Sequence, residues 1–339
     1  MKRPFFSLIT PVYNIERLIA KTIESALSQT FSDWEMVLVD DGSPDNAGKI
    51  CDEYANKDQR IKVVHKKNEG LAEARNVGIK NATGKYFLIL EGSDLFPNEN
   101  TLSSIYSVLS ENEVDIFFGK LQDVNETDGK VFGVQNDYSV NGFIGGGKEL
   151  FITLFDNEDV LALSSPVNKV FKTDFVKENE LWFCKGIYHD DDEWIPRTIS
   201  LSDKTYFTND IIYNAMTWDG CFGQVSSEKS LTKKAHDKMF LAEKCLKDID
   251  DRFPEKNTAF KKKYYEYYVR IFIDGVATLN SVKEENYRKT IIDSAKKYSA
   301  CFKYAGKCVS NNLKILSLIK KCLGTNFAIK MILKRYSAE

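Results

Sequence analysis

The sequence lacks several features that mark common protein classes. Its seven cysteines include no Cys-x-x-Cys pair and their number is odd, which is typical of reduced thiols and argues against a disulfide framework or a zinc site. The net charge is only −2, so composition gives no reason to expect a nucleic-acid partner. No apolar run reaches the roughly 18 residues of a membrane span, and no signal-peptide pattern precedes the first expected strand. We therefore expect a cytoplasmic protein.

Positive charge is nevertheless concentrated at the C-terminal end. From Lys296 onward, ten Lys and Arg residues stand against one acid, Glu339. Between Asn312 and Tyr336, apolar residues recur among these bases as in amphipathic helices. Such helices suit peripheral attachment to the inner face of an anionic membrane, and they equally suit packing on the rest of the chain or formation of a homo-oligomer.

The N-terminal part alternates between apolar segments and helical patterns. Four expected strands, each ending in a polar or glycine-containing loop, lie at residues 5–12, 34–39, 61–65 and 86–90. Apolar residues at helical spacing follow each strand. Repeated units of this kind predict an α/β fold with a doubly wound, mainly parallel sheet, whose function lies in the loops after the strands.

The later segments are less regular. We expect strands at 114–119, 167–171 and 211–213, helices at 148–155 and 191–199, and a hairpin or loop over 122–147. From about residue 227 the pattern is almost wholly helical. The prediction is an α/β domain, residues 1–225, followed by a helical, basic C-terminal region, residues 226–339.

The ends of the first two strands carry groups suited to a nucleotide. No Gly-x-Gly-x-x-Gly follows the first strand, so the Rossmann dinucleotide fingerprint is absent. Instead, Thr10, Pro11 and Tyr13 offer a hydroxyl, a rigid turn and an aromatic ring, and Asp41 follows the second strand. The ring could stack on a base, and the carboxylate could accept from a base N–H such as that of uracil. A packed tyrosine and a helix-capping aspartate are the alternatives.

The fourth strand ends in Glu91-Gly92-Ser93-Asp94, at the position where open α/β sheets bind ligands, although a solvated turn has the same pattern. Arg75 lies on the preceding helix and has the planar donor geometry that suits a diphosphate. Its alternative role is a surface ion pair with Glu69 or Glu73.

Together these residues resemble the bacterial family 2 glycosyltransferases, a large inverting family with the GT-A fold that builds capsules, teichoic acid decorations and lipopolysaccharide. The resemblance rests on ITPVYNIERLIAKTIESALSQTFSDWEMVLVDDGSPDNAG, NEGLAEARNVGIKNATGKYFLIL and EGSDLFP. It is strong over residues 5–120 and weak over 165–215. It implies a UDP-sugar donor bound by Thr10, Pro11, Tyr13, Asp41, Asn68, Arg75, Glu91, Gly92 and Ser93.

The acidic motif departs from the family pattern. Where the family usually reads F-L-D-S-D-D, this chain reads I-L-E-G-S-D. Ser93 therefore stands where an aspartate ordinarily binds Mn²⁺ or Mg²⁺, and it provides no anionic oxygen. We expect Glu91 and Asp94 to hold the ion instead.

A second acidic cluster, residues 190–193, opens the helix expected at 191–199. Such a cluster is unfavourable unless it faces solvent, a helix N-terminus or a cation. In the family, a His-Glu-Asp-x-x-Trp or Glu-Asp signature here supplies the catalytic base, and the match gives that role to Asp191, with Asp192 as runner-up. An inverting transfer requires one carboxylate to take the acceptor's proton. The alternative is a charged helix N-terminus.

The resulting hypothesis is a glycosyltransferase that moves a hexose or N-acetylhexosamine from a UDP-sugar to a surface glycan or lipid-linked glycan acceptor. Because the acidic motif is altered, the rival is a non-catalytic nucleotide-sugar-binding partner subunit of an active glycosyltransferase. A nucleotidyltransferase on a similar sheet comes third, since it gives no reason for the cluster at 189–194 and would release pyrophosphate.

Overall fold

The computed structural model of the chain describes residues 3–135, 142–157, 163–218, 227–256 and 258–336. The chain divides into two compact units, Met1–Gly186 with Asp190–Cys221, and Ile187–His189 with Phe222–Glu339. The expected boundary near residue 225 lies outside the described residues. The expected change from mixed α/β structure to helices is confirmed.

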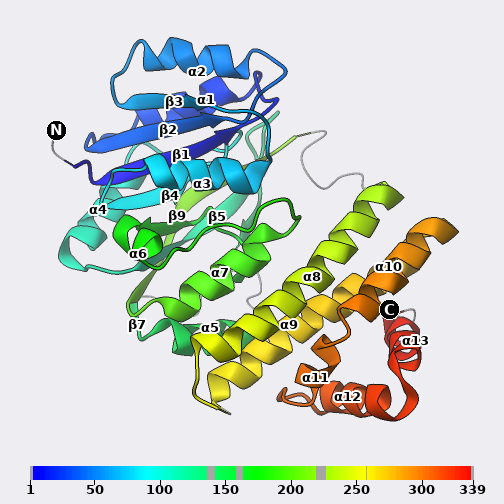
Figure 1. Cartoon of the computed structure of the whole chain (residues 1–339). Coiled ribbons are helices and arrows are strands. Elements are labelled where there is room, and N and C mark those ends of the chain that lie inside the picture. The colour runs from blue at the N-terminus through cyan, green and yellow to red at the C-terminus, as the bar shows by residue number, and fades with distance from the viewer. Residues whose placement is uncertain (1–2, 136–141, 158–162, 219–226, 257, 337–339) are drawn as a thin grey trace. The chain divides into compact units, whose positions relative to one another are not determined.

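The first unit is built on a single sheet (Figure 1). Its strands are β1 (Phe6–Val12), β2 (Trp34–Asp40), β3 (Ile61–His65), β4 (Tyr86–Ile89), β5 (Ile116–Asn125), β6 (Val131–Gln135), β7 (Gly142–Ile144), β8 (Lys169–Lys172) and β9 (Thr205–Thr217). Their order is β3-β2-β1-β4-β8-β5-β9-β7, with β6 paired to β5. The four strands β1 to β4 are parallel, as is the pair β5 and β9. The expected mainly parallel sheet is confirmed, although β8 runs antiparallel to both its neighbours.

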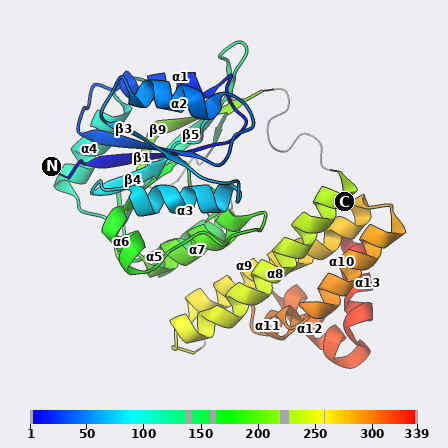
Figure 2. The same ribbon diagram turned by 45° about the horizontal axis from the view of Figure 1, so that its top comes forward.

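Helices cover both faces of this sheet, which is why β1 and β2 are buried along their whole length. The helices are α1 (Ile19–Leu27), α2 (Ala47–Ala55), α3 (Leu71–Asn81), α4 (Thr101–Glu111), α5 (Gly147–Asp156), α6 (Thr173–Glu178) and α7 (Asp190–Leu201). Phe6 and Leu8 share a core with α1, α2 and α4. Ile9 lies against α3, where a Cβ on Gly78 would come within 2.2 Å of Ile9 Cγ2. Figure 2 shows α3 and α7 on one side of the sheet and α1 and α2 on the other.

Two strands are longer than their sequence patterns indicate. The strand expected at 211–213 is the middle of β9. This strand pairs with β5 along most of its length, but its polar residues give no apolar pattern that would indicate a long strand. The strand expected at 114–119 continues to Asn125 and turns back into β6. A hairpin is therefore confirmed for residues 116–135, and residues 136–141 of the expected loop lie outside the described part of the chain.

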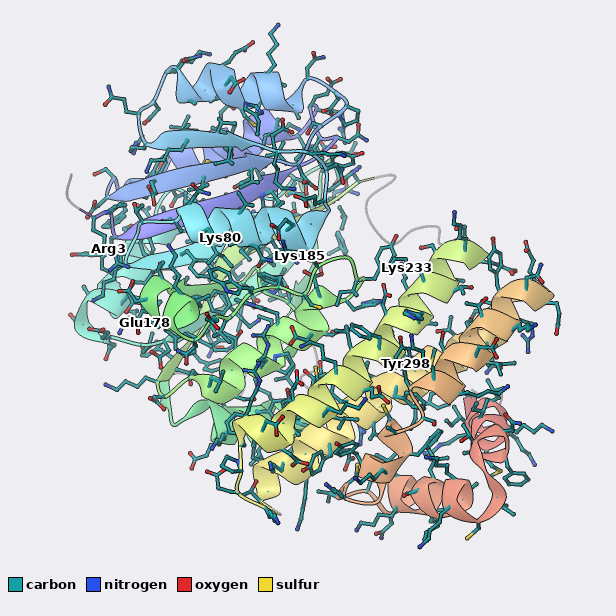
Figure 3. The ribbon with its side chains drawn as sticks, in the orientation of Figure 1. Arg3, Lys80, Glu178, Lys185, Lys233 and Tyr298 are labelled. Carbon is teal, nitrogen blue, oxygen red and sulfur yellow. The ribbon has the colours of Figure 1, made fainter. Side chains whose placement is uncertain are left out.

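In the second unit, every secondary-structure element of the described residues is a helix. It contains α8 (Glu228–Arg252), α9 (Ala259–Ala277), the 3₁₀ helix η2 (Thr278–Ser281), α10 (Glu285–Lys297), α11 (Cys301–Ala305), α12 (Asn311–Leu323) and α13 (Thr325–Tyr336). The Tyr298 hydroxyl meets His236 Nε2 of α8 at 3.1 Å, and Lys233 lies on the same helix (Figure 3). The segment 187–189 joins this unit, because Tyr188 N–H donates to Asp237 at 2.9 Å. Within the described ranges, no helix combines the length and apolar character needed to cross a bilayer.

Candidate active site

The carboxyl ends of β2, β1 and β4 meet at one edge of the sheet, because these parallel strands are neighbours. The chain moves outward from β1 through β2 to β3 and then returns to place β4 on the other side of β1. Open α/β sheets bind ligands in the crevice beyond such a reversal. A Cβ on Gly92 would lie 2.9 Å from the Pro11 carbonyl oxygen and 2.3 Å from Ile15 Cδ1. Glycine therefore lets the loops after β1 and β4 touch.

The loop after β1 exposes the ring of Tyr13 beside the buried end of the strand. Thr10 and Pro11 are buried within β1, and the Thr10 hydroxyl has no hydrogen-bond partner among the described residues. Tyr13 is 48% exposed. Asn14 follows with a left-handed φ of 54°, which turns the chain away from the strand. The ring of Tyr13 is accessible to a ligand, so the alternative of a tyrosine packed in the core is wrong.

Asp41 is buried and holds the loop that precedes α3. Its carboxylate accepts hydrogen bonds from the backbone N–H groups of Glu69 and Gly70, at 3.0 and 2.8 Å. It also accepts from Lys66 Nζ at 2.5 Å. The two backbone donors lie at the N-terminal end of α3, where N–H groups favour a negative charge. The exposed Asn68 directly precedes Glu69, whose N–H Asp41 holds, so the structure brings Asp41 and Asn68 together.

Arg75 is a buried residue of α3 that connects three elements. Its Nε and Nη2 atoms donate to one carboxylate oxygen of Glu91, at 3.2 and 2.7 Å, and Nη1 donates to Asp190 at 3.2 Å. Glu91 follows β4, and Asp190 begins α7. Burial lowers the pKa of the guanidinium, but the carboxylates of Glu91, Asp190 and Asp191 outweigh burial and raise it. Arg75 thus stays charged, and the alternative of a surface ion pair with its helix neighbours is wrong.

An aromatic stack supports the guanidinium of Arg75. The Phe183 ring centroid lies 5.2 Å from Arg75 Cζ, and the same ring stacks on Trp194 of α7 with centroids 4.2 Å apart. The Asn76 side chain donates to the Phe183 carbonyl at 3.0 Å and accepts from the Phe183 N–H at 2.8 Å. Lys185 forms a 2.8 Å ion pair with α3 (Figure 3). The segment before α7 is therefore fastened to α3, which fixes the start of α7 relative to Arg75.

The consecutive acids at the start of α7 have different environments. Asp190 is 7% exposed, and burial raises its pKa to about 6, although the neighbouring guanidinium opposes the shift. Glu193 is fully buried and pairs with Arg197 one turn later at 2.7 Å. Asp191 and Asp192 remain half-buried, and Asp191 accepts from the Asp192 N–H at 3.1 Å. These two carboxylates are the members of the cluster that stay partly accessible.

Asp94 is tied to β9. Its carboxylate oxygens accept hydrogen bonds from the Tyr213 hydroxyl at 2.6 Å and from the Met216 N–H at 2.9 Å. The Tyr213 oxygen accepts in turn from the Glu91 N–H at 3.1 Å. Burial raises the pKa of Asp94 to about 7, although its hydrogen bonds oppose the shift. The half-buried Ser93 places its hydroxyl 3.4 Å from Asp94 Oδ1.

The carboxylates around Arg75 are suitable ligands for a divalent cation. Three carboxylates act on one guanidinium there, so negative charge is in excess. Carboxylate and hydroxyl oxygens are the ligands that Mg²⁺ and Mn²⁺ take in proteins. The adjacent carboxylates of Asp191 and Asp192 also offer ligand atoms that lie within 4.8 Å of each other.

Sequence reasoning missed three parts of this arrangement. Tyr213 binds the loop after β4 from a position 122 residues away from Glu91, and no local pattern in β9 indicates that role. The contact of Lys66 with Asp41 has only a weak signal, a base near the end of a strand. Asp190 is visible in the acidic run, but its pairing with Arg75 depends on the packing of α7 near α3.

The sequence and fold define the class of this protein. Its residues 7–168 match the family model described as glycosyl transferase family 2. The chain is 32% identical over 215 residues to the glycosyltransferase GlyG of Streptococcus pneumoniae serotype 4, a match that covers 61% of this chain and 69% of GlyG. It is 29% identical to the glycosyltransferase GlyA of the same strain over 66% of this chain, but it spans only 32% of GlyA. The chain belongs to glycosyl transferase family 2.

Solved structures share the fold. Residues 1–349 of S. aureus TarS, in complex with UDP-GlcNAc, align with a TM-score of 0.70 at 20% identity, covering 98% of this chain and 92% of that chain. The mannosyltransferase PcManGT from Pyrobaculum calidifontis, in complex with GDP-Man and Mn²⁺, aligns with a TM-score of 0.50 at 13% identity, covering 98% and 88%. At these identities the likeness shows the fold, and it confirms the expected GT-A architecture.

Proposed function

We propose that this glycosyltransferase works in the cytoplasm and moves a hexose or N-acetylhexosamine from a UDP-sugar to a surface glycan or lipid-linked glycan, with inversion at the anomeric carbon. The observation that carries the proposal is the position of Arg75 between Glu91 and Asp190, which joins the loop after β4 to the start of α7. The complex of TarS with UDP-GlcNAc supports a uridine nucleotide as the donor.

In this proposal the uridine binds beyond β1 and β2. The exposed ring of Tyr13 stacks on uracil, and Asp41 accepts from the N3–H of the base. One carboxylate oxygen of Asp41 holds a single backbone N–H among the described residues, so it retains a lone pair for this contact. Thr10 and Pro11 fix the loop that carries Tyr13. Asn68 lies in the loop held by Asp41 and reaches the base or the diphosphate.

The diphosphate binds against the loop after β4. Gly92 keeps this loop in contact with the loop after β1, and Ser93 offers a hydroxyl. Arg75 makes three hydrogen bonds to carboxylates, which leaves two of its five N–H donors for a phosphate oxygen. A bound Mn²⁺ or Mg²⁺ would offset the charge of the leaving UDP. Glu91 would be its main ligand, because Asp94 already accepts two hydrogen bonds.

Asp191 acts as the base in this mechanism. While the acceptor hydroxyl oxygen forms its bond to the anomeric carbon, the hydroxyl proton passes to the Asp191 carboxylate. The bond from the anomeric carbon to the diphosphate oxygen breaks at the same time, and its electron pair leaves with UDP. Asp190, bound to Arg75, keeps the start of α7 in place and so positions Asp191. Asp192 is the alternative base.

One observation favours a second candidate function. Ser93 provides no carboxylate and Asp94 is engaged with β9, as expected for a nucleotide-sugar-binding partner without catalysis. UDP release separates the two functions. With Mn²⁺ and acceptor extracts, we expect one UDP-sugar to be turned over at least about 100-fold faster by the native protein than by Asp191→Asn. UDP binding without release from any UDP-sugar, with or without acceptor, would support the binding partner instead.

A further inference from the structure

The last two helices leave large apolar side chains in solvent. Along α12 and α13 these are Ile315 (52% exposed), Leu318 (59%), Leu323 (58%), Phe327 (42%) and Met331 (40%). Single exposed apolar residues are ordinary, but a set this close together along the chain is typical of an interaction surface. Figure 3 shows side chains of both helices projecting from the outer side of their ribbons.

These side chains lie on defined helix faces. On α12, Ile315 and Leu318 are three residues apart and therefore share a face. On α13, Phe327 and Met331 are four residues apart and also share one. Other residues hold both helices on the second unit, because they are buried: Leu316, Ala328, Ile329 and Ile332. The exposed apolar faces are thus presented by anchored helices.

The same helices carry uncompensated positive charge. Residues 311–336 contain six Lys and Arg residues and no acid. Lys320 is turned toward the unit, since its Nζ donates to the Ser299 carbonyl at 3.2 Å. In the part of the chain that the structure describes, none of the other five forms an ion pair: Lys314, Lys321, Lys330, Lys334 and Arg335.

We propose that α12 and α13 form a docking surface for an anionic lipid bilayer. Apolar side chains of an amphipathic helix enter the boundary of the acyl chains while its lysines reach the lipid phosphates. Charge complementarity selects this occupant: a second copy of the chain would bring two positive surfaces together, whereas anionic lipids satisfy both properties. The inference does not depend on the transfer reaction proposed above.

Co-sedimentation of the full chain with vesicles tests this surface. We compare phosphatidylcholine vesicles with vesicles that also contain phosphatidylglycerol, and we expect at least about tenfold tighter binding to the second kind, because each basic residue near the surface adds roughly fivefold. The charge variant is Lys321→Glu/Lys330→Glu/Lys334→Glu, for which a loss on the order of 100-fold is expected. The matched control makes the same charge change at exposed lysines elsewhere in the unit, Lys262→Glu/Lys283→Glu/Lys289→Glu, and it retains most of the binding.

An apolar variant separates insertion from charge alone. Leu318→Ser/Phe327→Ser/Met331→Ser keeps every lysine, and we expect it to bind anionic vesicles about tenfold more weakly. Equal binding of the native protein to both kinds of vesicle would overturn the proposal. So would binding of heparin that matches vesicle binding and survives in the apolar variant, which would indicate a surface for polyanions. A dimer detected by light scattering and lost in the apolar variant would reassign the surface to a second copy of the chain.

Discussion

Arg75 donates from Nε and Nη2 to the same carboxylate oxygen of Glu91, at 3.2 and 2.7 Å. The second oxygen of Glu91 has no hydrogen-bond or ion-pair partner among the described residues, and the side chain is 21% exposed. The pair thus fixes the orientation of a carboxylate while leaving one of its oxygens free. That is the property expected of a group that meets a cation or a diphosphate at the end of β4.

Replacing Arg75 should affect stability and activity differently. Arg75→Ala leaves Glu91 and Asp190 without their cation, and we expect a loss of roughly 3–5 kcal/mol in the free energy of unfolding. Arg75→Lys keeps the charge but loses the planar geometry, so UDP release should fall about 100-fold with a smaller loss of stability. Urea unfolding and UDP release measure the two effects, with Lys80→Ala on the exposed part of α3 as control. If Arg75→Lys released UDP at the native rate, the guanidinium would have no role in the mechanism.

Asp41→Ala should abolish the rise in melting temperature that UDP produces in the native protein. The change removes the proposed contact to uracil and also releases the loop that carries Asn68. Lys66→Met is the matched control, because it removes the ammonium but keeps the carboxylate and its two backbone donors; it should retain most of the UDP effect. If UDP raised the melting temperature of Asp41→Ala as much as that of the native protein, Asp41 would not contact the nucleotide and would only hold the loop.

Asp191→Asn should keep UDP binding and lose transfer. The amide occupies nearly the same volume but cannot take the acceptor proton, and such a loss amounts to about 100- to 10,000-fold in rate. Asp192→Asn is the natural comparison, since both side chains are half-buried at the start of α7. Full transfer by Asp191→Asn together with none by Asp192→Asn would move the base to Asp192.

The pH dependence of stability should reveal the burial of Asp94. Its pKa is raised to about 7 in the folded protein, so the folded state holds the proton more tightly than the unfolded state does. The stability contributed by this proton is present at low pH and is lost as pH rises through about 7. A shift of this size corresponds to a few kcal/mol, on the order of 1.4 kcal/mol per unit. Asp94→Asn should therefore gain melting temperature relative to the native protein more at pH 8.5 than at pH 5.5, and an equal difference at both would contradict the assigned pKa.

Much of the first unit could be predicted because its signals are local. The strands β1 to β4 are apolar runs that end in polar loops, and the order of those loops identifies the family. The length of β9 could not be predicted, because its polar residues pair through backbone groups that leave no trace in the side-chain pattern. The antiparallel direction of β8 could not be predicted either, since a strand of four residues carries no information about which strands it pairs with.

In the candidate site, too, the residues with local sequence signals could be predicted, and their long-range partners could not. Tyr13, Asp41 and Glu91 could be selected because each follows an expected strand, and Arg75 because it lies on the helix that precedes the fourth strand and in a segment that resembles the family. Partners that orient two of them come from distant parts of the sequence: Asp190 for Arg75 and Tyr213 for Glu91. These contacts depend on how α7 and β9 pack, which is decided by burial over the whole unit.

The central claim is that the ends of β1, β2 and β4 bind a uridine diphosphate. The most direct test is the melting temperature of the native protein with UDP, GDP, ADP or CDP, each with and without Mn²⁺. A ligand at about 100 times its dissociation constant adds about 2.7 kcal/mol to the stability of the folded state, which is a shift of several degrees. We expect this shift for UDP, enlarged by Mn²⁺, and little change for the other nucleotides. Equal shifts for all four nucleotides, or none for UDP, would contradict it.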